Sequence, residues 1–150
     1  MFILRSARAR LLAAALAACA GVKAQALVLS IAGNVSLTIN TVNSVGGGLA
    51  DDTDSTTYSV TNVLGTKKLV GRLNTAMPAH VTLKMQVAAP SGASSSGQVS
   101  LTASNQDLVT GIGLVTQSGL PITFTLSATV QAAVVTAGTR TVTLTLVDAP

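Results

Sequence analysis

The chain has 150 residues, with nine Lys and Arg against five Asp and Glu, a formal net charge of +4, one Tyr, two Phe and no Trp. Four of the nine basic residues lie before residue 27, so the rest of the chain is formally neutral, and the pI near 9.9 indicates no nucleic-acid partner. The scarcity of aromatic rings also argues against stacking on single-stranded nucleic acid or on sugars.

Residues 1–26 have the order of a secretory signal peptide. Three arginines form a basic start, residues 11–20 are an apolar run, and Ala24-Gln25-Ala26 supplies small residues for cleavage. The apolar run is about half the ~20 residues that a membrane-spanning helix needs. We therefore expect cleavage after Ala26, no transmembrane helix in the mature chain, and an extracytoplasmic location: secreted, periplasmic or on the cell surface.

Cys19 offers an alternative to that cleavage site. Leu16-Ala17-Ala18-Cys19 resembles a bacterial lipobox, in which the cysteine is lipidated and becomes the mature N-terminus. Under this interpretation the protein is held to a membrane by a lipid anchor. After Cys19 the chain has no cysteine, so no disulfide stabilises the fold in an oxidising compartment.

A strict two-residue alternation follows the leader over residues 27–39, a segment that we call the N-terminal ribbon. Its apolar row, interrupted by Gly33, consists of Leu27, Leu29, Ile31, Val35, Leu37 and Ile39. This pattern indicates a strand with one apolar face, about twice the usual length. Gly33-Asn34 would break it into two strands of its own fold, or let it cross between sheets at a bulge. Alternatively, the ribbon is donated to the sheet of a neighbouring molecule.

The rest of the chain consists of short alternating runs separated by Gly, Ser, Asn and Pro. The predicted strands cover residues 57–63, 68–73, 80–87, 98–103, 121–130 and 139–147. Threonine recurs on their polar faces, where its β-branch favours extended backbone and its hydroxyl tolerates water. The sequence therefore predicts an all-β chain: one antiparallel, immunoglobulin-like β-sandwich of about seven or eight strands over residues 27–150.

Asp51, Asp52 and Asp54 form the carboxylate cluster of the chain. Oxygen-bearing side chains alternate from Asp52 onward, as they do in a calcium loop, which makes the three aspartates a candidate metal site. The segment lacks the central glycine and the distal Glu of such a loop, so a solvated acidic turn is the alternative interpretation.

Few other residues suit chemistry. His80 is the sole histidine, and after Cys19 the chain has neither a thiol nor a Glu, whereas catalytic triads and most zinc sites need such partners at defined spacing. We therefore expect no enzymatic activity and no cofactor.

The last predicted strand carries a resemblance to a known group of proteins. Residues 137–146, Ala-Gly-Thr-Arg-Thr-Val-Thr-Leu-Thr-Leu, resemble the closing strand of bacterial secreted immunoglobulin-like surface proteins, including pilin subunits of the spore-coat-U type. Arg140 stands where those proteins commonly have an aromatic residue. The resemblance implies a β-sandwich and a role at the cell surface.

Together these features favour a non-enzymatic, exported structural protein, a building block of a coat, fibre or cell-surface layer that associates with itself or with other surface subunits. The alternative is an extracellular binding module, an adhesin or lectin-like domain, lipid-anchored through Cys19 in one version. Such a module would use the loops at residues 43–56 and 88–97.

Overall fold

The computed structural model describes residues 28–33, 35–37, 49–61, 63–129 and 138–150. The leader with Cys19 and the two ends of the N-terminal ribbon, Leu27 and Ile39, lie outside the described residues. Within the described ranges all regular structure is β-strand, and no helix there is long and apolar enough to cross a membrane.

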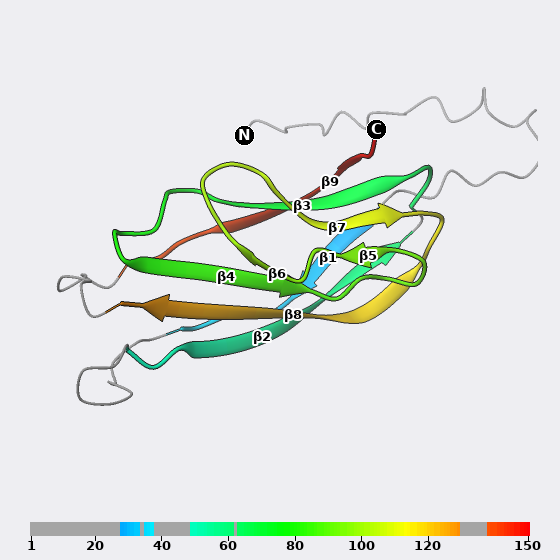
Figure 1. Ribbon diagram of the computed structural model, residues 1–150. Coiled ribbons are helices and arrows are strands. Elements are labelled where there is room, and N and C mark those ends of the chain that lie inside the picture. The colour runs from blue at the N-terminus through cyan, green and yellow to red at the C-terminus, as the bar shows by residue number, and fades with distance from the viewer. Residues whose placement is uncertain (1–27, 34, 38–48, 62, 130–137) are drawn as a thin grey trace, which may run out of the picture.

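One sheet has five strands in the order β1-β2-β8-β4-β6 (Figure 1). The strand bounds are Val28–Ala32 (β1), Asp52–Thr61 (β2), Gln117–Ala128 (β8), Val81–Val87 (β4) and Gln98–Ser100 (β6). The other sheet has the order β5-β7-β3-β9, with bounds Ser94–Ser95 (β5), Gln106–Ile112 (β7), Lys67–Leu73 (β3) and Val142–Asp148 (β9). Every neighbouring pair is antiparallel. The predicted antiparallel β-sandwich is confirmed.

Alternation along the strands builds the layer between the sheets. In β4, Leu83, Met85 and Val87 are buried, whereas the alternate residues face outward: the Thr and Lys are half-buried and the Gln is exposed. The same two-residue rhythm in β8 buries Leu120 and Ile122. Strands put successive side chains on opposite faces, so the longer strands of each sheet give an apolar row to the core, whereas β5 consists of two exposed serines.

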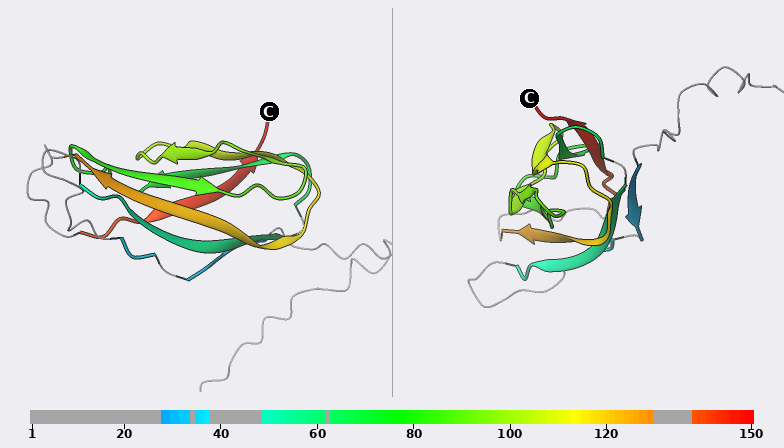
Figure 2. Two further views of the ribbon diagram at one scale, coloured as in Figure 1. Left: turned by 60° about the horizontal axis from the view of Figure 1, so that its bottom comes forward. Right: turned by 90° about the vertical axis from the view of Figure 1, so that its right-hand side faces the viewer.

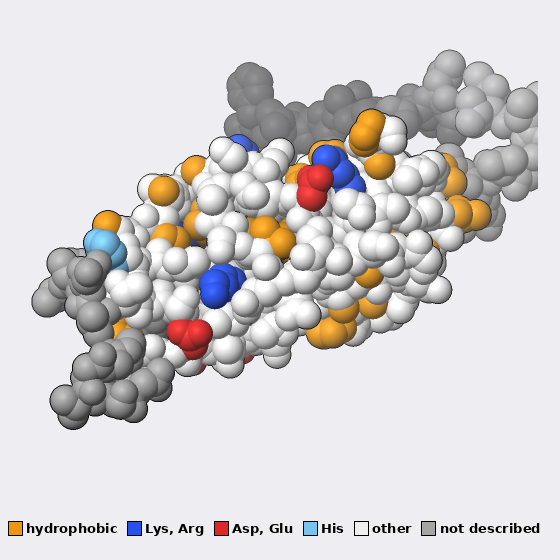
Figure 3. Space-filling model, in the orientation of Figure 1, with side chains coloured by type: hydrophobic (Ala, Val, Ile, Leu, Met, Phe, Trp, Pro, Cys, Tyr) orange, Lys and Arg blue, Asp and Glu red, His pale blue; other side chains and the backbone are white. Residues whose placement is uncertain are grey.

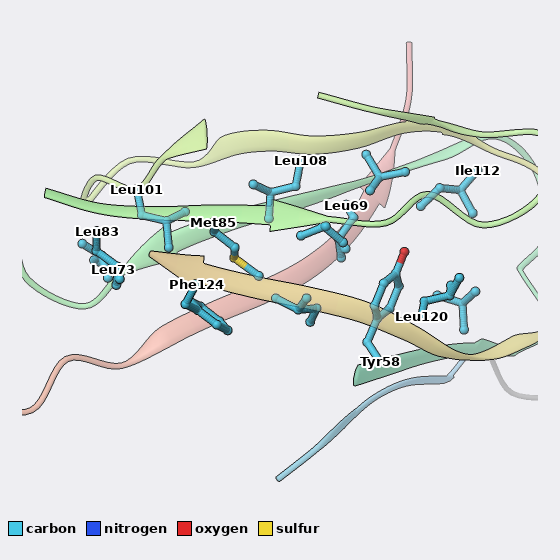
Figure 4. Packing of buried hydrophobic residues seen from close by; sticks show 14 of the residues in the cluster. Tyr58, Leu69, Leu73, Leu83, Met85, Leu101, Leu108, Ile112, Leu120 and Phe124 are labelled. Carbon is cyan, nitrogen blue, oxygen red and sulfur yellow. The ribbon is translucent and has the colours of Figure 1, made fainter. Parts of the chain in front are cut away.

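The core lies between the two sheets (Figure 4). Its largest fully buried side chains include Tyr58 from β2, Leu69 and Leu73 from β3, and Met85 from β4. Burial of such a side chain stabilises a fold by about 1.5–3 kcal/mol. Because the chain has no disulfide after Cys19, this apolar core carries the stability of the domain.

The N-terminal ribbon is broken at Gly33. β1 pairs with β2 from Val28 opposite Thr61 to Ala32 opposite Thr57, and the strand then ends because Gly33 has a φ of +79°. That left-handed backbone is open to glycine at little cost. β1 therefore ends at the predicted break, but residues 35–37 beyond it form no strand, so the second of the two expected strands is not seen in the part of the chain that the structure describes.

Candidate functional site: an open groove beside β9

β9 lies at an edge of its sheet. Among the described residues its strand partner is β3, paired from Lys67 opposite Asp148 to Leu73 opposite Val142. The side chains of β9 that point toward the core, Val142, Leu144 and Leu146, are only half-buried; we call them the inner row of β9. On β3, by contrast, Leu69 and Leu73 are fully buried. The sandwich is therefore less completely covered at β9 than at its centre.

A groove of about 620 Å³ opens at this edge. One wall is formed by β1 and the segment after it, and the other by residues 138–142 and Leu144. The side chains and backbone that line it come from Ile31, Gly33, Val35, Ser36, Leu37, Thr56, Met77, Leu83, Ile122, Phe124, Leu126, Gly138, Thr139, Arg140, Thr141, Val142 and Leu144. β1 and β9 lie on the same side of the sandwich, one at the edge of each sheet (Figure 2, right). The floor of the groove is thus the apolar core.

β1 covers this side poorly. Val28 is 45% exposed and Ile31 is 46% exposed, although both are large apolar residues. Leu29 is half-buried and packs on the core, as do Val35 and Leu37 beyond the break. The structure therefore brings Ile31, Val35 and Leu37 to the groove wall and leaves Leu29 beside the core.

The segment after β1 is held by a carboxylate. The backbone N–H of Ser36 donates to Oδ2 of Asp54 at 2.8 Å, and the N–H of Ser55 donates to Oδ1 of Asp54 at 2.7 Å. These two hydrogen bonds, chiefly the one from Ser36, hold the pKa of the Asp54 carboxyl below its usual range. Asp54 therefore has a structural task at the groove wall.

Arg140 places a cation at the end of the apolar groove. Its Nη1 donates to the carbonyl of Thr139 at 3.2 Å, and its Nε is buried with no hydrogen-bond partner among the described residues. The next residue, Thr141, is hydrogen-bonded to Asn74, which directly follows β3. Thr141 N–H donates to Asn74 Oδ1 at 3.0 Å, and Asn74 N–H donates to the Thr141 carbonyl at 2.9 Å. A buried donor without a partner costs free energy, so Arg140 suits an added hydrogen-bond acceptor.

The three aspartates of the candidate calcium loop lie at the start of β2. Asp52 and Asp54 belong to β2, and Asp51 directly precedes it. No three His, Cys, Asp or Glu side chains gather as metal ligands in the described part of the chain. His80 is an exposed turn residue with a φ of 65°, and its carbonyl accepts a hydrogen bond from Thr129 N–H at 3.0 Å.

Several charged side chains of the described residues are paired with one another. Charged side chains are few and stand apart or in small groups on the face seen in Figure 3. Lys67 is paired with Asp148, and Lys68 Nζ lies 3.0 Å from Asp107 Oδ1. The basic residues near the start of β3 are therefore largely neutralised by acids on the neighbouring strands.

Comparison with protein-family models, curated proteins and solved structures gave no match to this chain. Sequence reasoning identified the ribbon and the apolar alternation of β9, but it did not identify the groove between them. In the sequence, Arg140 drew attention only through the resemblance of the last strand to secreted surface proteins. Its even spacing from Val142, Leu144 and Leu146 could have indicated that its side chain lies on the same face as theirs.

Proposed function

We propose that this protein is an exported, non-enzymatic structural subunit, a building block of a coat, fibre or cell-surface layer. The observation that carries the proposal is that, among the described residues, no strand pairs with the outer edge of β9, whose inner row is only half-buried. The outer edge of a strand presents N–H and C=O groups that pair readily with another strand. A strand laid there would also cover apolar side chains, at about 25 cal/mol for each Å² removed from water.

The four sheet edges differ in how they are protected. β5 and β6, at two of the edges, have two and three residues. Such short strands are a common protection against edge-to-edge pairing. β9 has seven residues, VTLTLVD, with a regular register on β3 and one charge at its end. It is the longest edge strand in the described part of the chain and the least protected.

We propose the N-terminal ribbon of a neighbouring copy as the strand that completes this edge. The ribbon follows the leader directly and carries the apolar row Leu27, Leu29, Ile31, Val35, Leu37 and Ile39. Strand addition of this kind takes its affinity from backbone hydrogen bonds and its specificity from alternate side chains. The exposure of Val28 and Ile31 favours exchange, because little apolar burial holds β1 on its own β2.

Electron microscopy of the exported protein at high concentration tests the building-block role. We expect ordered filaments or layers. Leu144→Lys, which puts a charge in the groove, should abolish them, whereas Leu114→Lys, at a loop residue that is 82% exposed, should leave them intact. Monomers in the wild-type sample, together with retention on a specific glycan, would favour the binding-module alternative.

A second variant tests the strand-donation proposal in case the Leu144→Lys variant does not fold. Deletion of residues 27–32 removes the donor strand and, with it, part of one groove wall, but retains β9 and its inner row as the acceptor edge. Added to wild-type chains, this variant should occupy growing ends without extending them and so shorten the assemblies. Assemblies of unchanged length that incorporate the deletion variant along their whole length would exclude strand donation while leaving the building-block role in place.

A further inference from the structure

We propose that Arg140 sets the register in which the N-terminal strand of a second copy pairs with β9, by lying beside Gly33 of that strand. The inference rests on the proposed function, since it concerns how one subunit's ribbon seats in the groove of the next. It adds a specificity-determining residue to that site.

A charged residue, Arg140, precedes the inner row of β9 by two positions. Arg140 lies an even number of residues before Val142, and both line the groove, so the row reads cation, then Val142, Leu144 and Leu146. The guanidinium offers a buried Nε–H that lacks an acceptor among the described residues. A strand that fills the groove must therefore have apolar side chains along most of its length. At the end beside Arg140 it must have a small residue that leaves space for the guanidinium, and a hydrogen-bond acceptor for its Nε–H.

The N-terminal ribbon has that pattern in reverse order. Its row reads Leu27, Leu29, Ile31, then Gly33, which has no side chain. Antiparallel pairing with Gly33 opposite Arg140 places Ile31 opposite Val142, Leu29 opposite Leu144 and Leu27 opposite Leu146. Glycine in a strand allows a close approach, and its peptide carbonyls stay open to the Arg140 Nε–H.

Slipped registers lose this match. A shift of two residues in one direction puts Ile31 against the half-buried Arg140 side chain with its unpartnered Nε. The same shift in the other direction puts Gly33 against Val142 and leaves a hole in the core. A shift of one residue turns Ser30 and Ala32 inward and every leucine outward. Only the register with Gly33 opposite Arg140 buries three apolar pairs and leaves space for the Arg140 side chain.

Straightening at Gly33 permits the exchange. In the free chain Gly33 has a φ of +79°, which ends β1, whereas a continuous donor strand needs extended backbone at that position. Glycine adopts both conformations readily. Parallel pairing would also place Gly33 beside Arg140, with Val35, Leu37 and Ile39 along the inner row, but every strand pair in the described sandwich is antiparallel and parallel pairing is somewhat weaker.

Intermolecular disulfide trapping tests the register. The full chain with Cys19→Ser contains no other thiol, so a single introduced cysteine can bridge only to another chain. Ser30→Cys chains are mixed, in separate samples, with Thr141→Cys, Thr143→Cys or Thr145→Cys chains and oxidised after assembly. These four positions are exposed and point away from the core, so the substitutions spare the apolar packing.

The proposed register puts Ser30 opposite Thr143. We expect about fivefold or more dimer from that mixture than from the Thr141→Cys or Thr145→Cys mixtures, because diagonal neighbours about 7–8 Å apart exceed the reach of a disulfide. A maximum at another position, or dominant bridging of Ser36→Cys to Thr143→Cys as parallel pairing requires, overturns the register. If wild-type chains do not assemble, the proposed function fails as well; assembly without the Ser30–Thr143 bridge overturns the register alone.

Substitution of Arg140 tests whether this residue sets the register or only supports the fold. In an Arg140→Ala background we expect Ser30→Cys to bridge to Thr141→Cys, Thr143→Cys and Thr145→Cys in nearly equal amounts, whereas Arg140→Lys should retain a preference for Thr143→Cys. Arg72→Ala, at an exposed arginine of β3 outside the groove lining, is the matched control. An unchanged preference for Thr143→Cys in Arg140→Ala, with assembly intact, would show that Arg140 does not set the register.

Discussion

Leu144 of β9 lies directly over Gly71 of β3. The two residues are opposite each other in the register, and a Cβ at position 71 would fall 3.2 Å from Leu144 Cδ2 and 2.7 Å from Leu108 Cδ1. Glycine at this place lets two leucines of one sheet close over the backbone of β3. The approach of Leu144 to the backbone of β3 requires the glycine at this position.

Gly71→Ala should therefore destabilise the sandwich. The added methyl group must displace Leu108, which is fully buried, or Leu144, and overpacking of this kind costs about 1 kcal/mol or more. Urea unfolding of the monomeric chain measures the change. Gly113→Ala is the control, because nothing lies within 4 Å of that position, and its free energy of unfolding should change by about 0.5 kcal/mol or less. Equal effects of the two substitutions would contradict the packing account.

Tyr58→Phe should also lower stability. The Tyr58 hydroxyl donates to the carbonyl of Ala88 at 2.5 Å and is buried with its ring, which is 1% exposed. Removal of the hydroxyl leaves the partly buried carbonyl without this donor, at a cost of about 1–2 kcal/mol. The free energy of unfolding by urea measures it, and a variant as stable as the wild type would show that the hydrogen bond adds nothing.

The same tyrosine predicts a pH dependence at the alkaline end. Burial raises the pKa of Tyr58 to about 12 from the ordinary value of 10.0, because the charged form loses its hydration. The unfolded chain thus ionises at lower pH than the folded chain. The contribution of Tyr58 is fully present below pH 10 and is lost as the pH rises toward 12, at up to about 1.4 kcal/mol per pH unit.

Unfolding by urea between pH 9 and about 12 measures this contribution in the wild type and in Tyr58→Phe, with the same lysines titrating in both chains. The wild type should lose more stability across the window, so that the two curves converge. Parallel curves over the whole range would contradict the burial of an ionisable Tyr58.

On the acid side, the tie between Asp54 and Ser36 predicts a coupled titration. The Ser36 and Ser55 hydrogen bonds hold the pKa of Asp54 below its ordinary 3.8, so their contribution to stability is present above pH 3.8 and is lost as the pH falls through the lower folded value. The amide proton shift of Ser36 in NMR spectra should follow that titration, with a midpoint below 3.8. Asp51→Asn should leave the midpoint unchanged, and a Ser36 shift insensitive to acid would refute the contact.

The sequence predicted the strands best where alternation was unbroken. The segment 80–87 became β4 because Leu83, Met85 and Val87 all find partners across the sandwich. The segment 57–63 was predicted too short, since β2 begins at Asp52. Aspartates disfavour strands in isolation, but here the long strand β8 pairs with them, Leu126 opposite Asp52.

The candidate site was harder to predict than the strands. Alternation in β9 predicts Val142, Leu144 and Leu146 as inward-facing, but local pattern does not tell whether a further strand covers an inward residue. That row is half-buried at the edge of its sheet, and β1, at the edge of the other sheet, ends at Ala32. The role of Arg140 likewise depends on the groove and not on its sequence neighbours.

Hydrogen exchange read by mass spectrometry tests most directly the claim that subunits join at the open edge of β9. Assembled wild-type chains are compared with the monomeric Leu144→Lys variant, peptide by peptide. We predict that peptides covering residues 138–148 and 28–33 become more protected on assembly, while those covering residues 94–100 at the opposite edges do not change. Unchanged protection over residues 138–148 in assembled chains, with the gain elsewhere, would contradict the account.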